Sequence, residues 1–200
     1  PGMTSRHIRT FLLGLAALLP VWALAHTGLD GGAHHARGFV AGLLHPLTGA
    51  DHLGAMLSVG LWSALTARRL WVTPLAFVSM LLVGALIGLA GLRLPAVEPM
   101  IAASLLVLGL LVATRTHAPA ALAAALVGLF AVFHGVAHGS ELAGDASIWP
   151  TLAGMLLCTA ALHITGLGLG LALRSRSPWW PRLAGGAVST LGGALLMQLA

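Results

Sequence analysis

Residues 37–66 read RGFVAGLLHPLTGADHLGAMLSVGLWSALT, an apolar stretch that carries one proline, two histidines and one aspartate. As one helix, such a stretch would extend about 45 Å, which is longer than the hydrocarbon core of a bilayer at about 30 Å. Proline removes a backbone donor and clashes with the preceding turn. We therefore expect a short helix to about His45, a break at Pro46–Gly49, and a second helix from Ala50. Broken backbone at membrane depth is tolerated where it lines a polar cavity.

The composition of the whole chain agrees with a lipid environment. The chain has 200 residues, of which 58% are hydrophobic and 8% charged, and its mean hydropathy is +0.95. A soluble domain carries roughly a quarter charged residues, so this chain cannot cover itself with a polar surface. Five further apolar segments follow the first, near 70–91, 96–114, 119–140, 148–173 and 182–199. The sequence predicts an all-α, polytopic membrane helix bundle with six transmembrane helices in the mature chain, the first of them broken near Pro46–Gly49.

The N-terminal region is typical of a secretory signal. Pro1-Gly2 ahead of Met3 is interpreted as a cloning remnant, and Arg6 and Arg9 form a charged region before the apolar residues 11–19. Ala23-Leu24-Ala25 is a small-residue cleavage site. Residues 1–25 are thus predicted to be a signal peptide, with an uncleaved first helix as the alternative, and residues 26–200 a single transmembrane domain.

The arginines predict the orientation of the bundle. All ten basic residues are arginine, placed singly or in pairs between apolar segments, which argues against a nucleic-acid partner. With six helices and an external mature N-terminus, eight of the ten fall on the cytoplasmic side, as the positive-inside rule requires. Only Arg37 and Arg93 fall outside. We expect a multi-pass protein of the bacterial inner membrane with a periplasmic mature N-terminus.

Ionisable residues inside membrane helices are costly and usually functional, and two clusters of them occur. The first runs from His45 through Asp51 and His52, and Met56 follows one turn later with a thioether that is also a candidate ligand. Asp51 could bind a cation directly or accept a ring N–H from His52 and fix its tautomer. The first cluster therefore offers a set of metal ligands on both sides of the predicted break.

The second cluster contains His134 and His138, which are four residues apart on one helical face, followed by Glu141 at the membrane edge. His163 is a further intramembrane histidine, with an interhelical hydrogen bond as its structural alternative. Depths estimated from the predicted topology place both clusters in the outer half of the bundle. The sequence therefore predicts one shared cation site.

Outside the membrane, His26 would become the mature N-terminus, where its amine and imidazole could chelate a cation arriving from outside. Imidazole and carboxylate ligands without thiolate suit Ni²⁺, Co²⁺ or Zn²⁺, and Cu²⁺ remains open, whereas Cu⁺ prefers thiolates. Cys158, the one cysteine, is interpreted as a packing residue. We expect the cation to be a transported substrate, with no prosthetic group.

The two clusters match a known pattern. The string His45-Pro46-x-x-Gly49-x-Asp51-His52-x-x-x-Met56-x-x-Val59-Gly60 resembles the first-helix signature of the HupE/UreJ nickel/cobalt transporters. The string Phe133-His134-Gly135-x-Ala137-His138-Gly139-x-Glu141 resembles the second signature of that family. The similarity extends over the mature chain. It implies uptake of Ni²⁺ or Co²⁺ by a secondary transporter that supplies hydrogenase or urease maturation, with His45, Asp51, His52, His134 and His138 as the site.

Two other functions could also use buried histidines. An intramembrane metal-dependent hydrolase would need three ligands and an activated water, but the chain lacks a His-Glu-x-x-His string. A di-haem electron carrier would use histidine pairs as axial ligands, and a colourless protein would dismiss it. We therefore predict a transporter and no enzyme, with the lipid bilayer and the metal cation as its partners. The sequence leaves assembly into a homo-oligomer open.

Overall fold

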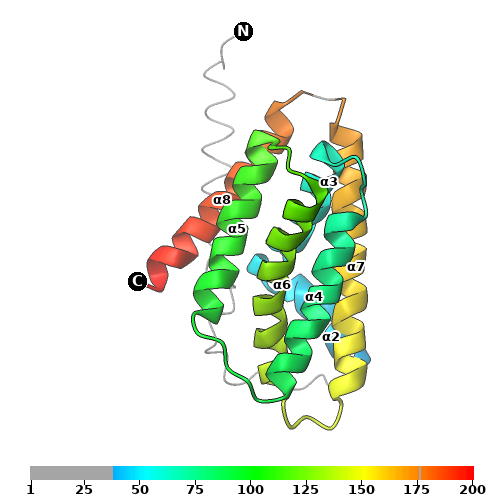
Figure 1. The fold of residues 1–200 in the computed structure, drawn as a ribbon, viewed down its shortest axis with the longest axis vertical. Helices are drawn as coiled ribbons and strands as arrows, with labels where there is room; N and C mark the ends of the chain where they lie inside the picture. The colour runs from blue at the N-terminus through cyan, green and yellow to red at the C-terminus, as the bar shows by residue number, and fades with distance from the viewer. Residues whose placement is uncertain (1–37, 176) are drawn as a thin grey trace.

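The computed structural model describes residues 38–175 and 177–200, and within these residues it contains helices and no strand (Figure 1). The predicted signal peptide in 1–25 and the candidate ligand His26 lie outside the described residues. The described helices are α2 (Phe39–Thr48), α3 (Ala50–Thr66), α4 (Val72–Leu89), α5 (Val97–Thr114), α6 (Ala120–Leu142), α7 (Ile148–Leu173) and α8 (Trp179–Gln198).

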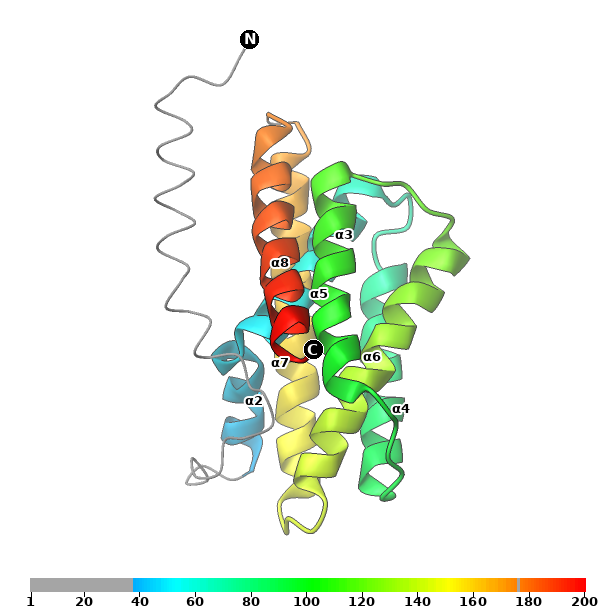
Figure 2. The same ribbon diagram turned by 90° about the vertical axis from the view of Figure 1, so that its left-hand side faces the viewer.

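The first apolar segment is broken, as predicted, but over fewer residues. Helix α2 continues through Pro46 to Thr48, and only Gly49, with φ −95° and ψ 121°, separates it from α3. A single proline removes one backbone donor and does not by itself end a helix. At the end of α2 the Thr48 hydroxyl donates a hydrogen bond of 2.8 Å to the carbonyl of His45. Helix α2 lies in the lower half of the bundle, and α3 continues upward from about its middle (Figure 2).

Four described helices are long and apolar enough to cross a membrane, namely α4, α5, α6 and α7. Helix α2 is a shorter apolar helix of 10 residues, and α3 has 17 residues. The protein is therefore a multi-pass membrane protein. A total of six crossings would require α2 and α3 to cross the membrane together as one span, and α8 to cross it as another. This count stays a prediction.

Glycine residues join the helices into three closely packed groups. Helix α4 packs mainly on α6, α5 on α8, and both α2 and α3 on α7. At each contact a glycine lies against the partner's backbone, so that an added Cβ would collide with it. These glycines are Gly84, Gly88, Gly135 and Gly139 for α4 and α6, Gly109, Gly185 and Gly192 for α5 and α8, and Gly42, Gly60, Gly154 and Gly166 for α2, α3 and α7. Close approach of this kind is how small residues hold membrane helices together.

The connections between helices separate by charge. The links α3–α4, α5–α6 and α7–α8 lie together at the upper end of the bundle in Figure 1, and α4–α5 and α6–α7 lie at the lower end. The upper links carry Arg68, Arg69, Arg115 and Arg174, whereas the lower ones carry Arg93 with Asp145. Among the described links, the arginines are thus divided between the two ends as predicted.

Candidate functional site

The break between α2 and α3 positions the first histidine pair. His45 lies near the end of α2 and His52 in the first turn of α3, so one residue of extended backbone separates the two helices that carry them. Their ring centroids are 5.8 Å apart. His138 of α6 lies against both, at 4.9 Å from His45 and 4.6 Å from His52. The two sequence clusters therefore meet inside the bundle.

These three imidazoles form a group with the spacing of metal ligands. One ring nitrogen from each of His45, His52 and His138 lies within 4.8 Å of the corresponding nitrogens of the other two. His52 and His138 are buried. A metal ion binds imidazole nitrogens at about 2.0–2.1 Å, which puts two nitrogens on one ion roughly 3 to 3.5 Å apart. A small inward movement of the side chains would suffice to bring three nitrogens onto one cation.

Asp51 holds the orientation of His52. One carboxylate oxygen, Oδ1, accepts hydrogen bonds from the His52 backbone N–H at 2.8 Å and from ring Nδ1 at 2.9 Å. Since a carboxylate can only accept, Nδ1 carries the proton and Nε2 of a neutral ring carries a lone pair. That Nε2 is buried and has no hydrogen-bond partner among the described residues. The geometry favours Asp51 as the residue that fixes the His52 tautomer, one of the two roles left open by the sequence.

His134 lies one helical turn before His138 in α6 and next to His52. Its ring is fully buried, at 0% exposed, and its centroid is 5.2 Å from that of His52. Ring atom Nε2 is 3.0 Å from the hydroxyl of Ser104 on α5, and Nδ1 has no hydrogen-bond partner among the described residues. The Phe77 ring of α4 lies 5.8 Å from His134. Three helices therefore enclose this imidazole.

His163 and Met56 lie together between α7 and α3. Nδ1 of His163 donates a hydrogen bond of 2.8 Å to the backbone carbonyl of Met56, an interhelical bond that leaves Nε2 buried without a hydrogen-bond partner among the described residues. The Met56 sulfur accepts a hydrogen bond of 3.4 Å from the Thr159 hydroxyl. Phe77 lies 5.1 Å from His163 and thus contacts both this ring and His134. Neither Met56 nor His163 belongs to the group of three histidines.

Glu141 lies at the end of α6, next to the cluster. Its Oε2 is 3.6 Å from Nδ1 of His138, and its side chain is 56% exposed while that of His138 is 3% exposed. The carboxylate thus connects a buried imidazole with the exposed end of α6.

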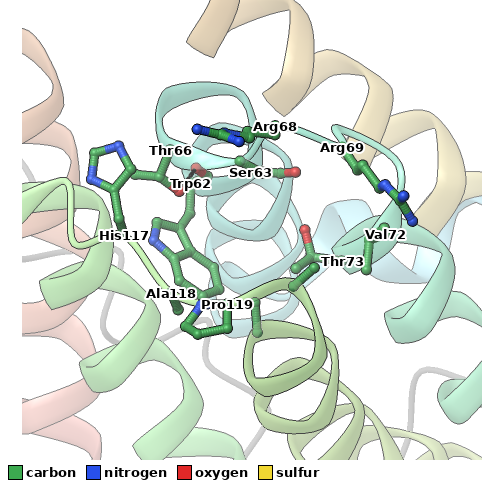
Figure 3. Close-up of a pocket in the computed structure, with 13 residues that line it drawn as sticks. Trp62, Ser63, Thr66, Arg68, Arg69, Val72, Thr73, His117, Ala118 and Pro119 are labelled. Atoms are coloured by element: carbon green, nitrogen blue, oxygen red, sulfur yellow. Dashed lines mark hydrogen bonds between the residues drawn. The ribbon is translucent and has the colours of Figure 1, made fainter.

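The bundle also has a cavity of about 380 Å³ at the end that carries most of the arginines. Figure 3 shows Trp62, Thr66 and Arg68, from α3 and the link after it, together with His117 and Pro119 of the α5–α6 link around this cavity. The Trp62 indole donates a hydrogen bond of 2.8 Å to the carbonyl of Thr116 and so ties α3 to the α5–α6 link. None of the candidate ligands lines this cavity, and His117 is exposed, as expected from the sequence.

Two residues at the site were not predicted from the sequence. Ser104 and Phe77 touch the histidines, but a serine or a phenylalanine in an apolar helix carries no pattern that distinguishes it from a packing residue. Their roles follow from which helices pack together, and the sequence alone did not predict those pairs.

The chain is similar to known proteins over almost its whole length. The family model described as "HupE / UreJ protein" matches residues 13–195. The chain belongs to the HupE/UreJ family. It is 43% identical over 192 residues to "Protein HupE" of Rhizobium leguminosarum bv. viciae, which covers 95% of this chain and 97% of that protein. No solved structure matches the chain. Membership of the HupE/UreJ family and the apolar helices together identify a multi-pass membrane protein of a transporter family, as the sequence predicted.

Proposed function

We propose that this HupE/UreJ protein is a secondary transporter that imports a divalent transition-metal cation, Ni²⁺ or Co²⁺, across the bacterial inner membrane. The observation that carries the proposal is the convergence of His45, His52 and His138, whose ligand nitrogens lie within 4.8 Å of one another. These residues come from three different helices. Buried polar atoms are normally hydrogen-bonded, so a bare imidazole nitrogen inside the bundle, such as His52 Nε2, is a candidate ligand for a cation.

The donor set supports a borderline divalent cation. Imidazole nitrogens suit Ni²⁺, Co²⁺ and Zn²⁺, and also Cu²⁺. Cys158 is buried in the apolar core between helices and is not part of the histidine group, so the group offers no thiolate for Cu⁺. The family resemblance favours Ni²⁺ or Co²⁺ among the remaining cations.

The positions of the residues suggest an order of events. A cation reaches exposed Glu141 at the end of α6, passes to His138 beside it, and is held by His45 and His52. His134 lies next to His52 and takes part in the same site, whereas His163, beyond the shared neighbour Phe77, serves as a relay toward the arginine end. That end is cytoplasmic by the positive-inside rule, and the mature N-terminus is periplasmic.

Nickel uptake into vesicles reconstituted with the purified chain tests this function. His52→Ala removes one of the three grouped nitrogens, and we expect it to abolish the protein-dependent accumulation of Ni²⁺ inside the vesicles. His117→Ala is the matched control because His117 is exposed and lies outside the group, so it should accumulate nickel like the unmodified chain. Normal accumulation by the His52→Ala chain at equal protein content would contradict the proposed site.

A further inference from the structure

Ser104 makes an unusual pair of contacts. Its hydroxyl Oγ is 0% exposed and lies 2.6 Å from the carbonyl oxygen of Ile101, in the same helix, and 3.0 Å from Nε2 of His134 on α6. The serine thus joins the backbone of α5 to a histidine of the candidate site across a helix interface.

The hydrogen atoms of these two contacts can be assigned from the chemistry of the groups. A carbonyl oxygen only accepts, and a serine hydroxyl has one hydrogen to donate. That hydrogen goes to Ile101, so the lone pairs of Oγ face His134 and Nε2 must be the donor. In the neutral imidazole the other nitrogen, Nδ1, then carries the lone pair.

We propose that Ser104 is a positioning residue that holds His134 as the Nε2–H tautomer, so that its Nδ1 lone pair is available to the transported cation. The inference rests on the proposed function, and it adds a residue from α5 to a site otherwise built from α2, α3 and α6. Nδ1 of His134 is buried without a hydrogen-bond partner among the described residues, and its ring is 5.2 Å from that of His52.

Ser104 orients a histidine as Asp51 does, but its side chain carries no charge. Asp51 accepts a hydrogen bond from the Nδ1–H of His52. Ser104 accepts a hydrogen bond from the Nε2–H of His134 through a neutral hydroxyl. A second carboxylate in the apolar bundle would add the cost of burying another charge. The hydroxyl fixes the tautomer without that cost.

Nickel titration by calorimetry of the full chain in detergent tests the proposal. Groups that orient metal-binding histidines typically contribute 10- to 100-fold to affinity, and we expect Ser104→Ala to weaken Ni²⁺ binding by about that factor. Ser104→Thr retains the hydroxyl and should recover most of the loss. Ser189→Ala is the matched control, because Ser189 is also buried and donates to a carbonyl of α5, that of Leu106, at 3.1 Å but contacts no imidazole.

NMR of the chain with isotope-labelled histidine provides a readout that a purely structural role would not change. In the metal-free protein one buried histidine should show the Nε2–H tautomer, and Ser104→Ala should convert that signal to a mixture of tautomers. Wild-type affinity in Ser104→Ala, or an unchanged His134 tautomer, would overturn the role of Ser104. A wild-type chain that binds no divalent cation would overturn the proposed function, and the tautomer measurement would still decide the role of Ser104.

Discussion

At the scale of single residues, three buried imidazoles differ in the group that accepts their N–H. A carboxylate holds His52, a serine hydroxyl holds His134, and a backbone carbonyl holds His163. In each case the remaining nitrogen is buried and has no hydrogen-bond partner among the described residues. Each of these three rings is thus oriented by one nitrogen and, in its neutral form, has a lone pair on the other, which is how histidine is presented to a metal ion.

Substitutions of Asp51 separate its two chemical roles. Asp51→Asn keeps an oxygen that can accept the Nδ1–H of His52 but loses the charge, whereas Asp51→Ala loses both. If Asp51 acts by orienting His52, we expect Asp51→Ala to weaken Ni²⁺ binding by about 10- to 100-fold and Asp51→Asn to weaken it much less. Equilibrium dialysis of the purified variants against nickel measures both affinities.

The control for this series is Asp145→Asn, because Asp145 lies in the α6–α7 link and accepts from Ser147 at 2.8 Å. Its nickel affinity should equal that of the unmodified chain. Equal losses for Asp51→Asn and Asp51→Ala would instead assign Asp51 as a charged ligand of the cation.

At the scale of helices, the hydrophobic pattern predicted most of the bundle. The segments expected near 96–114 and 148–173 correspond to α5 (Val97–Thr114) and α7 (Ile148–Leu173). This agreement has a physical reason, since lipid offers no hydrogen bonds to the backbone and only closed structures such as helices satisfy it. The end of α2 was predicted less well, because whether a proline ends a helix depends on the groups around it.

The residues that the sequence predicted to share a site were those with regular spacing within one helix, such as His134 and His138. Their meeting with His45 and His52 followed from estimated depth and is confirmed by the ring distances. The contact of Ser104 with His134 could not be predicted, because it depends on the rotation of α5 against α6, and nothing in a run of apolar residues specifies that angle.

The close contact between α4 and α6 should be sensitive to one methyl group. A Cβ on Gly84 would lie 2.9 Å from the Cα of Val132, against backbone that cannot move away independently. We expect Gly84→Ala to lower the free energy of unfolding by about 1–3 kcal/mol, the usual cost of overpacking. The thermal unfolding midpoint in detergent reports the change.

Gly186→Ala is the matched helical control, because an added Cβ there meets nothing within 4 Å. Its midpoint should be unchanged or slightly higher, since alanine favours helix more than glycine does. Equal midpoints for the two variants would show that α4 and α6 do not need their close approach.

At the scale of the whole molecule, the distribution of arginines between the two ends predicts the orientation in the membrane. His117 lies in the α5–α6 link at the arginine-rich end, and Leu92 lies in the α4–α5 link at the opposite end, where it is 61% exposed. In intact cells, we expect Leu92→Cys to react with a membrane-impermeant thiol reagent that is small enough to enter the periplasm. His117→Cys should react only after the inner membrane is permeabilised.

The native thiol provides the background for this labelling, and because Cys158 is buried at 4% exposure it should react little. The reverse pattern, with His117→Cys labelled in intact cells and Leu92→Cys protected, would invert the proposed orientation and with it the direction of import.

The glycine contacts have a consequence for how such a bundle can move. Backbone touching backbone resists sliding inside each of the three groups, α4 with α6, α5 with α8, and α2 and α3 with α7, so displacement is easiest where the groups meet. The residues of the site are divided across those boundaries. His45 and His52 belong to the α2–α3–α7 group, and His134 and His138 belong to the α4–α6 group. Ser104, which contacts His134, belongs to the α5–α8 group. In the proposed transporter, a rotation of the α4–α6 group against the α2–α3–α7 group would therefore separate His138 from His45 and His52 in a single motion. We expect the same change of shape to release the cation and to open its exit.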